Sequence, residues 1–415
     1  MKVLDVTEFY SERGGGVRSH LALKSHVLCQ LGHEHVVVAP GSRDGEKQSD
    51  LWPGRIARTA GRARVIRVRG PASPYDPSYH LLVNANKVRD IVARETPDVL
   101  EIHSPYMAAL GALRAARSSY GVRTFQWHSD FIDTYSGVLE DKVPFLPSPV
   151  VRSVTRPLWS LVRSIARHCD ATLVASAWQV NKLRAHRVPN VVHRPFGIER
   201  DVFRPEVRSR ETRRELLARA GIESDDDRTA IVVGVGRFAI EKRWDVVIDA
   251  FRRVRARGRR AILVLFGDGP ERERMKARAR AGMSTPDVVF AGFTKDRAVL
   301  ARNLASADVL LHGCPFETFG LSIAEAMSSG LPTAVPDDGG AAEMHDPASG
   351  ERYAAGDVGA CADALDRLLG RVAENGDAMR NAAVRAASRL PSVEEQFQQQ
   401  IALYSDLLAR RARAG

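Results

Sequence analysis

The stretch that decides the fold is residues 314–340, which reads CPFETFGLSIAEAMSSGLPTAVPDDGG. A Phe-Gly-Leu-Ser turn leads into apolar residues at helical spacing, which predicts a helix over residues 321–329. Gly330 then suits the helix end, because glycine adopts a left-handed conformation at little cost. Residues 331–335 are a short apolar run typical of a buried strand. The unit is therefore strand, loop, helix, strand.

The loop of this unit has the features of a ligand site. Its backbone N–H groups and the positive end of the helix dipole suit a phosphate or a polarised sugar. Glu317 lies on the loop and Glu325 lies eight positions later on the helix, so both could face one ligand. Ionised carboxylates accept strong hydrogen bonds from hydroxyls. A solvated helix face is the ordinary alternative, but the glycine-flanked loop and its apolar surroundings favour a nucleotide sugar.

The run PFETFGLSIAEAMSSGLP, residues 315–332, resembles the E-x7-E signature of retaining family 4 glycosyltransferases with the GT-B fold. The resemblance covers most of the chain. It implies an α/β protein of two Rossmann-like, doubly wound domains that face each other across a cleft, with a C-terminal helix crossing back to the N-terminal domain. The expected domains are an acceptor-side domain, residues 1–205 with 393–415, and a nucleotide-sugar-binding domain, residues 206–392.

Length and composition agree with a two-domain protein. The chain has 415 residues, enough for two sizeable cores. No apolar run approaches the ~20 residues that a membrane span needs, and residues 1–9 read as a strand instead of a signal peptide. A cytoplasmic location is therefore expected. The four cysteines lack ligand-like spacing, which argues against structural zinc and a disulfide framework.

The chain is basic, with a formal charge of +11 from 61 basic and 50 acidic residues. Such a balance suits nucleic acid, anionic lipid or anionic substrates. No recognition helix, RNP-like strand or zinc finger is found, so nucleic acid is not expected as a partner. Residues 150–167 form a basic amphipathic stretch that could lie peripherally on the inner face of an anionic membrane. A domain helix with a solvated basic face is the favoured interpretation.

The N-terminal half begins with a parallel βαβ unit. A strand over residues 2–9, a glycine loop, a helix over 17–31 and a strand over 35–40 predict a right-handed crossover. The glycines do not form the dinucleotide fingerprint G-x-G-x-x-G. They let a backbone approach a ligand closely, although a tight turn is the alternative. Family members use the equivalent loop beside the donor diphosphate, a role that the resemblance puts on Gly15 and Gly16.

His128 ends another predicted strand of this half. Open α/β sheets bind ligands at the carboxyl ends of their strands. A histidine satisfied by local hydrogen bonds is the usual alternative, but the resemblance places a histidine at this strand end near the six-position of the donor sugar. Asp130 is a weaker candidate, for orienting that histidine or meeting the acceptor. Further strands are expected at 64–68, 97–104, 122–128, 171–176 and 190–195, and helices at 79–94, 106–120, 150–167 and 177–186.

The C-terminal half repeats the alternation of strand and helix. Strands are expected at 231–236, 261–267, 287–292 and 308–312, and helices at 244–257, 271–281, 295–305, 357–369, 377–390 and 394–410. Arg237 and Lys242 lie between a strand and a helix, where Arg offers a planar fork and Lys a point charge to a diphosphate. Surface charge is the alternative, but the pattern Gly-Arg-x-x-x-x-Lys resembles the family's diphosphate clamp. Residues 225–227 contain the chain's Asp-x-Asp, in a hydrophilic connector that favours a solvated turn over a metal site.

The expected reaction moves a hexose from a nucleotide diphosphate sugar of GDP or UDP type to a hydroxyl acceptor, with retention and without a metal or other cofactor. The resemblance places Glu317 on the transferred sugar and Glu325 on the ribose. The charge of the leaving diphosphate would be neutralised by two cations and by loop amides, namely Arg237, Lys242, Phe319, Gly320, Leu321 and Ser322.

The wording of the signature favours mannose, followed by glucose or galactose. The sequence leaves the acceptor open among a glycan, a glycolipid and a small molecule. Two other functions remain open as well. One is a sugar-phosphate synthase or phosphorylase of the same fold, and the other is a non-catalytic nucleotide-sugar-binding protein.

Overall fold

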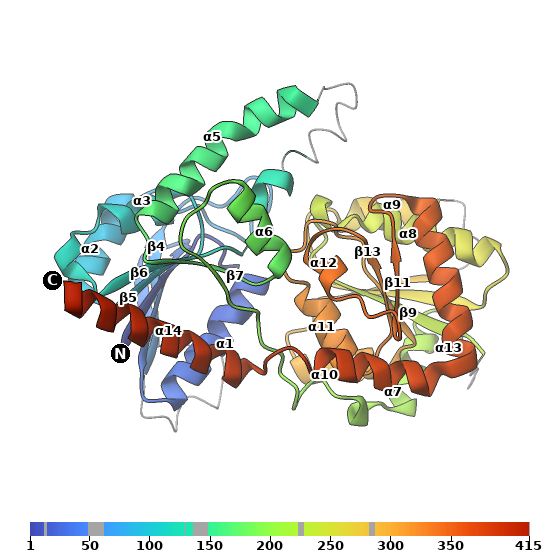
Figure 1. Cartoon of the computed structure of the whole chain (residues 1–415). Helices are drawn as coiled ribbons and strands as arrows, with labels where there is room; N and C mark the ends of the chain where they lie inside the picture. The colour runs from blue at the N-terminus through green and yellow to red at the C-terminus, as the bar shows by residue number, and fades with distance from the viewer. Residues whose placement is uncertain are drawn as a thin grey trace. The chain divides into compact units, whose positions relative to one another are not determined.

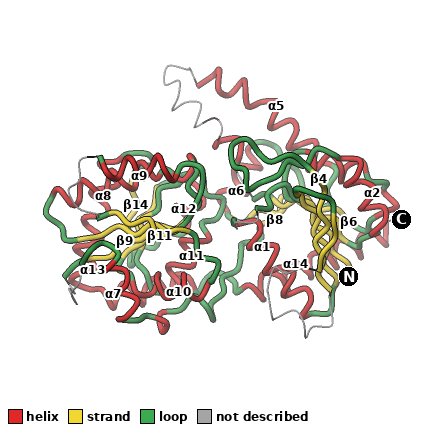
Figure 2. The backbone as a smooth tube through the Cα atoms, turned by 180° about the vertical axis from the view of Figure 1, so that it is seen from behind, coloured by secondary structure: helices red, strands yellow, loops and turns green. Residues whose placement is uncertain are grey.

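The computed structural model describes residues 1–11, 15–48, 62–128, 130–134, 136, 148–222, 228–281 and 287–414. The chain forms two compact units, Met1–Pro195 with Val393–Gly415, and Phe196–Ser392 (Figure 1). In each unit the strands form one inner sheet with helices outside it (Figure 2). The predicted pair of doubly wound α/β units is therefore confirmed.

The first unit contains an eight-stranded sheet in the order β3-β4-β2-β1-β5-β6-β7-β8. Every neighbouring pair is parallel except β3 with β4. The strand order changes direction between β1 and β5, so the loops after these two strands leave a topological switch point. The strands are β1 (Lys2–Val6), β2 (Glu34–Gly41), β3 (Gly45–Gln48), β4 (Arg62–Arg69), β5 (Val99–Ile102), β6 (Val122–Gln126), β7 (Ala171–Val174) and β8 (Val191–His193).

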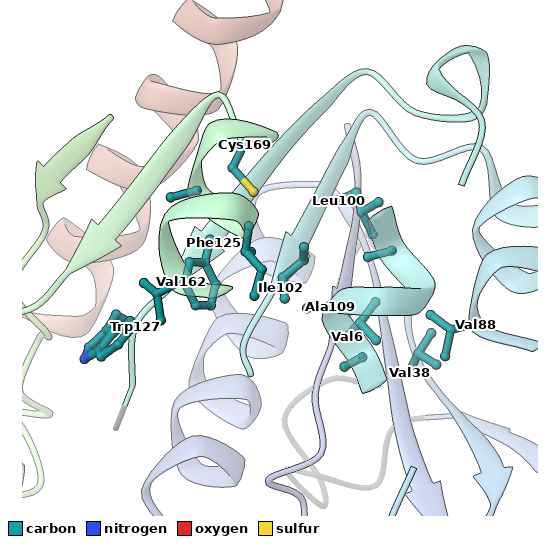
Figure 3. Packing of buried hydrophobic residues seen from close by; sticks show 14 of the residues in the cluster. Val6, Val38, Val88, Leu100, Ile102, Ala109, Phe125, Trp127, Val162 and Cys169 are labelled. Atoms are coloured by element: carbon teal, nitrogen blue, oxygen red, sulfur yellow. The ribbon is translucent and has the colours of Figure 1, made fainter. Parts of the chain in front are cut away.

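Alternation along the strands gives this sheet two buried faces. Leu4 and Val6 of β1 pack into a cluster with helices α2, α3, α5 and α6. Figure 3 shows Val6 of this cluster close to Ala109 of α3. Val3 points to the other face and packs with Leu28 of α1 and Tyr404 of α14. The C-terminal helix therefore belongs to the first unit, as the GT-B expectation required. The helices are α1 (Gly16–Gln30), α2 (Ala85–Glu95), α3 (Met107–Arg114), α5 (Ser148–Arg167), α6 (Ala177–Ala185) and α14 (Val393–Ala414).

Two predicted helices of this unit are shorter than expected. The helix predicted from residue 79 begins only at Ala85, because the Asn84 side chain accepts from the Lys87 N–H at 3.0 Å and caps it there. Before the cap, Ala72 and His80 form an isolated antiparallel bridge. The helix predicted over 106–120 ends at Arg114 and is followed by a short 3-10 helix, η2 (Arg117–Ser119).

The second unit contains a six-stranded parallel sheet in the order β11-β10-β9-β12-β13-β14. The chain runs outward from β9 to β11 on one side and from β12 to β14 on the other. Its switch point therefore lies between β9 and β12, where ligands bind in open α/β sheets. The strands are β9 (Ala230–Val235), β10 (Ala261–Phe266), β11 (Val288–Gly292), β12 (Val309–Leu311), β13 (Thr333–Pro336) and β14 (Gly350–Tyr353).

The helices predicted in the second unit are present, but two of them are joined, and the short helix at Gly339–Glu343 was not predicted. The two helices expected at 357–369 and 377–390 form one element, α13, that is kinked at Asn375, where φ is −137°. The other elements are α7 (Arg210–Ala218), α8 (Trp244–Ala256), α9 (Arg272–Arg280), α10 (Arg297–Ser306), α11 (Leu321–Ser328), α12 (Gly339–Glu343), α13 (Val358–Ala387), η3 (Pro205–Val207) and η4 (Ile240–Lys242).

Three points concern other parts of the chain. Residues 45–48, for which no strand was predicted, form β3 and pair with β4. The Asp-x-Asp at 225–227 lies outside the described residues. Across the residues that the structure covers, no helix has both the length and the apolar character that crossing a membrane requires.

Candidate active site

The switch point of the second unit brings two loops together, one after β9 and one after β12. Gly313 makes this approach feasible, because a Cβ at this position would lie 2.8 Å from the backbone oxygens of Lys242 and Arg243. A larger residue would push the loops apart. The glycine thus places the residues that follow β12 directly against the loop that carries Lys242.

An ion pair joins the two loops. The Lys242 ammonium donates to Oε1 of Glu317, and His312 Nε2 lies 3.3 Å from the same oxygen. Burial alone would raise the pKa of Glu317, but attraction to Lys242 outweighs it and holds the pKa well below the usual range. Burial opposes the charge on Lys242 as well, and Glu317 nevertheless raises the Lys242 pKa. Both groups are therefore charged at neutral pH.

Arg237 has a different carboxylate partner. It follows β9, and its guanidinium NH2 lies 3.2 Å from Oε1 of Glu241, a pair that is about one-third exposed on the arginine side. The Trp244 indole donates to the Arg237 backbone oxygen at 2.9 Å, which ties the arginine to the start of α8. The two sequence-predicted cations thus lie on one short loop, each beside a carboxylate.

The start of α11 supplies backbone donors to this site. Gly320 has φ 93°, a left-handed conformation that favours glycine, and it precedes the helix. The N–H groups of Ile323 and Ala324 bond to the Gly320 oxygen at 2.9 and 3.0 Å. Within the described structure, the N–H groups of Leu321 and Ser322 donate no hydrogen bond. These two amides and the helix dipole can therefore bind an anionic oxygen.

Phe319 anchors the loop next to these amides. Its ring is buried, with 2% exposed, and packs edge-on against Phe196 with 5.4 Å between the ring centroids. The Gly340 N–H also donates to the Glu317 backbone oxygen at 2.7 Å. The loop that carries Glu317 is thus held by packing on one side and by a backbone hydrogen bond on the other.

Glu325 takes part in a second ion pair, with Arg297. The NH2 group of Arg297 lies 2.6 Å from Glu325 Oε1, and its Nε donates to Glu199. Burial would lower the pKa of Arg297, but the two carboxylates raise it above its ordinary value. Burial and the nearby Glu325 charge raise the pKa of Glu199, although Arg297 opposes the shift. The side chain of Glu325 is therefore held in place by Arg297.

In the first unit, the two glycines predicted to lie beside the diphosphate differ in how much space surrounds them. Gly15 has φ 131° and precedes α1, and a Cβ there would lie 3.0 Å from the Tyr79 hydroxyl. Gly16 is the first residue of α1, and a Cβ there would meet nothing within 4 Å. A side chain at Gly15 would therefore be strained by the backbone conformation and would crowd the Tyr79 hydroxyl, whereas Gly16 leaves open space beside the helix start.

His128 follows β6 and contacts another histidine. Its Nε2 lies 2.6 Å from Nδ1 of His103, and the two rings stack with centroids 4.9 Å apart. The ring of His20 packs edge-on at 5.0 Å. Burial lowers the pKa of His128 well below its ordinary value, and the neighbouring imidazoles lower it further. His128 is therefore neutral at physiological pH.

Asp130, the weaker candidate, is buried and paired with a lysine. Lys182 donates to both Asp130 and Asp133, and its ammonium lies 4.7 Å from the centroid of the Trp178 ring. In the structure, Asp130 thus pairs with Lys182, whereas His128 contacts His103.

Two groups of residues have ligand types that metals bind. His312, Cys314 and Glu317 form one, and Asp5, Glu101 and His103 form the other, with ligand atoms within 4.8 Å in each group. In both groups a lysine ammonium already lies against a carboxylate oxygen, from Lys242 or from Lys24. A divalent cation would have to share that space with an existing positive charge. Both groups fit a lysine ammonium better than a metal ion.

Sequence reasoning did not identify His312, Arg297, Glu199 or His103. His103 and His312 could have been identified, because each lies at or near the end of a predicted strand, at 97–104 or 308–312, the same signal that identified His128. Arg297 and Glu199 carried no such signal, since each is a charged residue in an ordinary helix or connector.

Two family models match separate parts of the chain. Residues 219–386 match the family described as Glycosyl transferases group 1, and residues 14–201 match the family described as Glycosyltransferase Family 4. The chain is 30% identical over 349 residues to a GDP-mannose-dependent alpha-mannosyltransferase of Mycolicibacterium smegmatis, covering 84% of this chain and 82% of that protein. It is 28% identical over 365 residues to a GDP-mannose-dependent alpha-(1-6)-phosphatidylinositol dimannoside mannosyltransferase of Mycobacterium tuberculosis, covering 88% and 84%.

Solved structures share the fold over nearly the whole chain. Sucrose-phosphate synthase from Thermosynechococcus elongatus superposes with a TM-score of 0.73 at 19% identity, covering 99% of both chains. Anabaena HepE in complex with UDP-glucose gives a TM-score of 0.70 at 17% identity, covering 98% of this chain and 100% of that one. At these low sequence identities, the superpositions support only the fold, which consists of two α/β units.

Proposed function

The chain belongs to glycosyltransferase family 4 and is a glycosyltransferase with the GT-B fold, and from this premise we propose that it transfers mannose from GDP-mannose to a hydroxyl of a glycan or glycolipid. The proposed transfer retains the anomeric configuration and needs no metal ion. The mannosyltransferase relatives support the choice of donor.

The observation that carries the proposal is the meeting of Lys242 and Glu317 beside the start of α11. A nucleotide sugar needs cationic and N–H groups for its diphosphate and acceptors for its hydroxyls. Lys242 and the amides of Leu321 and Ser322 supply the first kind, and the Glu317 carboxylate supplies the second. The loops after β9 and β12, with the start of α11, thus offer groups that complement both the diphosphate and the sugar of the donor.

In the proposed step the bond between the sugar C1 and the diphosphate oxygen breaks, and its electron pair stays on the leaving phosphate. The acceptor oxygen forms the new bond to C1 on the same face of the sugar. Its proton passes to the departing phosphate oxygen, so charge and atoms balance. Preorganised positive groups lower the barrier most where negative charge develops, which assigns this role to Lys242, Arg237 and the amides.

Three further roles come from the family resemblance and fit the local chemistry. Glu325, held by Arg297, would accept hydrogen bonds from the ribose hydroxyls. His128 would bind the donor sugar near its six-position, and its neutral ring suits a hydrogen bond to a hydroxyl. Gly15 would let the backbone before α1 come close to the diphosphate.

A donor panel tests the proposal directly. Purified protein is incubated with GDP-mannose, UDP-glucose or UDP-galactose, with and without mannosylated glycolipid acceptors, and nucleoside diphosphate release is measured. Acceptor-dependent GDP release with an α-linked product by NMR is expected, and Glu317→Gln should lose it. Binding without turnover on any acceptor would favour a nucleotide-sugar-binding protein. Release of sugar 1-phosphate on adding orthophosphate would favour a phosphorylase.

A further inference from the structure

Residues 199–203 form a turn, here called the entry turn, close to the point where the chain enters the second unit. The N–H groups of Val202 and Phe203 donate to the Glu199 backbone oxygen at 3.0 and 2.8 Å, and these two bonds close the turn. The Phe203 side chain is completely buried. The entry turn is therefore held both by its own backbone and by the core of the second unit.

The entry turn is also bonded to helix α11, which carries Glu325. The Ser328 hydroxyl donates to the Phe203 backbone oxygen at 2.6 Å, and this bond is buried. Ser328 and Glu325 are three positions apart on α11, so their side chains lie on the same face of the helix. The face of α11 that presents Glu325 is therefore the face that contacts the entry turn.

Arg297, the first residue of α10, connects the entry turn to Glu325. Its Nε donates to Glu199, and its NH2 group donates to Oε1 of Glu325 at 2.6 Å. The guanidinium carbon lies 4.8 Å from the centroid of the Phe203 ring, which adds a favourable cation–π contact. Helices α10 and α11 lie side by side (Figure 1). The guanidinium is thus held by two residues of the entry turn while it binds the carboxylate on α11.

Glu325 uses one of its two carboxylate oxygens in these contacts. Oε1 accepts from Arg297, and across the described residues Oε2 forms no hydrogen bond or ion pair. The side chain is 5% exposed, so few water molecules compete for Oε2, and a hydrogen bond made there is stronger than one made in bulk water. A sugar hydroxyl can both donate and accept, so it can bind Oε2 whether or not this oxygen carries a proton.

We propose that Arg297 is a positioning residue for the nucleoside end of the donor: held by the entry turn, it fixes Oε1 of Glu325 so that Oε2 hydrogen-bonds the vicinal hydroxyls of the ribose. This inference rests on the proposed function, because it needs Glu325 to bind the ribose. Arginine suits the task, since its planar guanidinium presents several N–H donors at fixed angles and can hold two carboxylates at once. The entry turn thereby controls how strongly the site prefers a ribose to a sugar that lacks the two hydroxyls.

Arg213 provides a matched control for Arg297. Its NH1 group lies 2.8 Å from Asp308 Oδ2, and its NH2 group donates to the Thr229 backbone oxygen at 2.8 Å. The Arg213 side chain is 13% exposed, compared with 22% for Arg297. Thr229 and Asp308 come directly before β9 and β12, whereas the candidate site follows the other ends of these strands. Replacing Arg213 therefore breaks a comparable ion pair away from the donor site.

The first measurement is calorimetry of the full-length protein with GDP and 2′,3′-dideoxy-GDP, and with UDP and its dideoxy analogue. The wild type should bind the ribose form about 10-fold or more tightly, because the dideoxy form lacks hydrogen bonds to a charged group. Arg297→Ala should reduce this preference to about 3-fold or less by weakening the ribose form alone. Arg213→Ala should keep the full preference. A preference that survives in Arg297→Ala, or that Arg213→Ala lowers equally, would overturn the inference.

Two variants of the entry turn keep the test decisive if Arg297→Ala folds poorly. Glu199→Gln retains a side-chain oxygen that can accept from Arg297 Nε, so its preference for the ribose form should stay within about 3-fold of the wild type. Glu199→Ala removes that acceptor and should lower the preference toward the value of Arg297→Ala. Equal preferences in Glu199→Gln and Glu199→Ala would overturn the inference, because the entry turn would then not act through Arg297.

Failure of this inference can be told apart from failure of the proposed function. A wild type that transfers mannose but binds GDP and dideoxy-GDP equally would overturn the inference and leave the transferase activity standing. A wild type that prefers the ribose form but transfers no sugar to any acceptor would overturn the proposed function alone. A wild type that binds neither pair of nucleotides would overturn both.

Discussion

The ammonium of Lys242 contacts the carboxylate of Glu317, although the two residues lie 75 positions apart in the chain. Each comes from a loop after a central strand, β9 or β12, and adjacency of these strands creates the contact. The pair holds a cation next to an acceptor of hydroxyl groups before any ligand arrives. In the proposed function, the donor diphosphate engages Lys242 while its sugar engages Glu317.

Glu317→Gln should abolish most transfer and leave the fold intact. The amide keeps the shape but loses the charge that binds Lys242 and the sugar hydroxyls, so kcat should fall on the order of 100-fold or more. Stability should drop by about 1–3 kcal/mol, because Lys242 loses its partner. Steady-state kinetics and urea unfolding check both effects. Turnover near the wild-type level would contradict the assigned role.

Lys242→Ala should weaken GDP-mannose and free GDP together, because the ammonium is proposed to bind the diphosphate that both share. A loss of about 10- to 100-fold in each Kd is expected by calorimetry. Lys276→Ala is the matched control, since Lys276 on α9 pairs with the exposed Glu273 at 2.8 Å. Unchanged affinity of Lys242→Ala for both ligands would remove this residue from the diphosphate site.

Arg297→Ala should weaken donor binding through Glu325. Removing the guanidinium leaves two buried carboxylates, Glu199 and Glu325, without their shared cation. The donor KM should rise and the free energy of unfolding should fall by about 3 kcal/mol. Adding Glu199→Gln should recover part of the stability, because one repelling charge is removed. A double variant no more stable than Arg297→Ala would contradict this coupling.

The Lys242–Glu317 pair should make stability depend on pH at the acidic end. The pKa of Glu317 is lowered in the folded protein relative to about 4.3 in the unfolded chain. Its contribution is therefore complete above pH 4.3 and is lost as the pH falls toward the folded-state pKa. The gap in unfolding free energy between wild type and Glu317→Gln should be about 1 kcal/mol smaller at pH 3.5 than at pH 7. A constant gap would argue against the ion pair.

A chelator should leave transfer unchanged, because Lys242, Arg237 and the α11 amides are proposed to neutralise the leaving diphosphate. The test is the rate of GDP release before and after dialysis against EDTA. Loss of activity that added magnesium or manganese restores would defeat the metal-free mechanism, whereas an unchanged rate would support it.

Much of the architecture was predictable because it depends on local patterns. Alternating apolar runs and helical periodicities predicted both α/β units, and the family signature at residues 315–332 predicted the GT-B fold. Local patterns were less reliable at element ends. The helix predicted from residue 79 begins at Ala85 because a single cap, Asn84, and a bridge between Ala72 and His80 outweigh the apolar periodicity before it.

The candidate site likewise contains residues that the sequence predicted and partners that only the structure revealed. Sequence spacing placed Glu317 before a helix and Lys242 after a strand, since both positions are defined by their own segments. Spacing could not reveal that Arg297 and Glu199 join Glu325, or that His103 joins His128, because the partners lie on separate elements.

The sequence by itself determined the alternation of strands and helices, the family and the residue types at each strand end, because these depend on neighbours along the chain. Only the tertiary structure decided which carboxylate meets which cation and which nitrogen of His128 faces a partner. Those contacts are set by the strand order, β9 beside β12 and β1 beside β5, which brings distant segments within hydrogen-bonding distance.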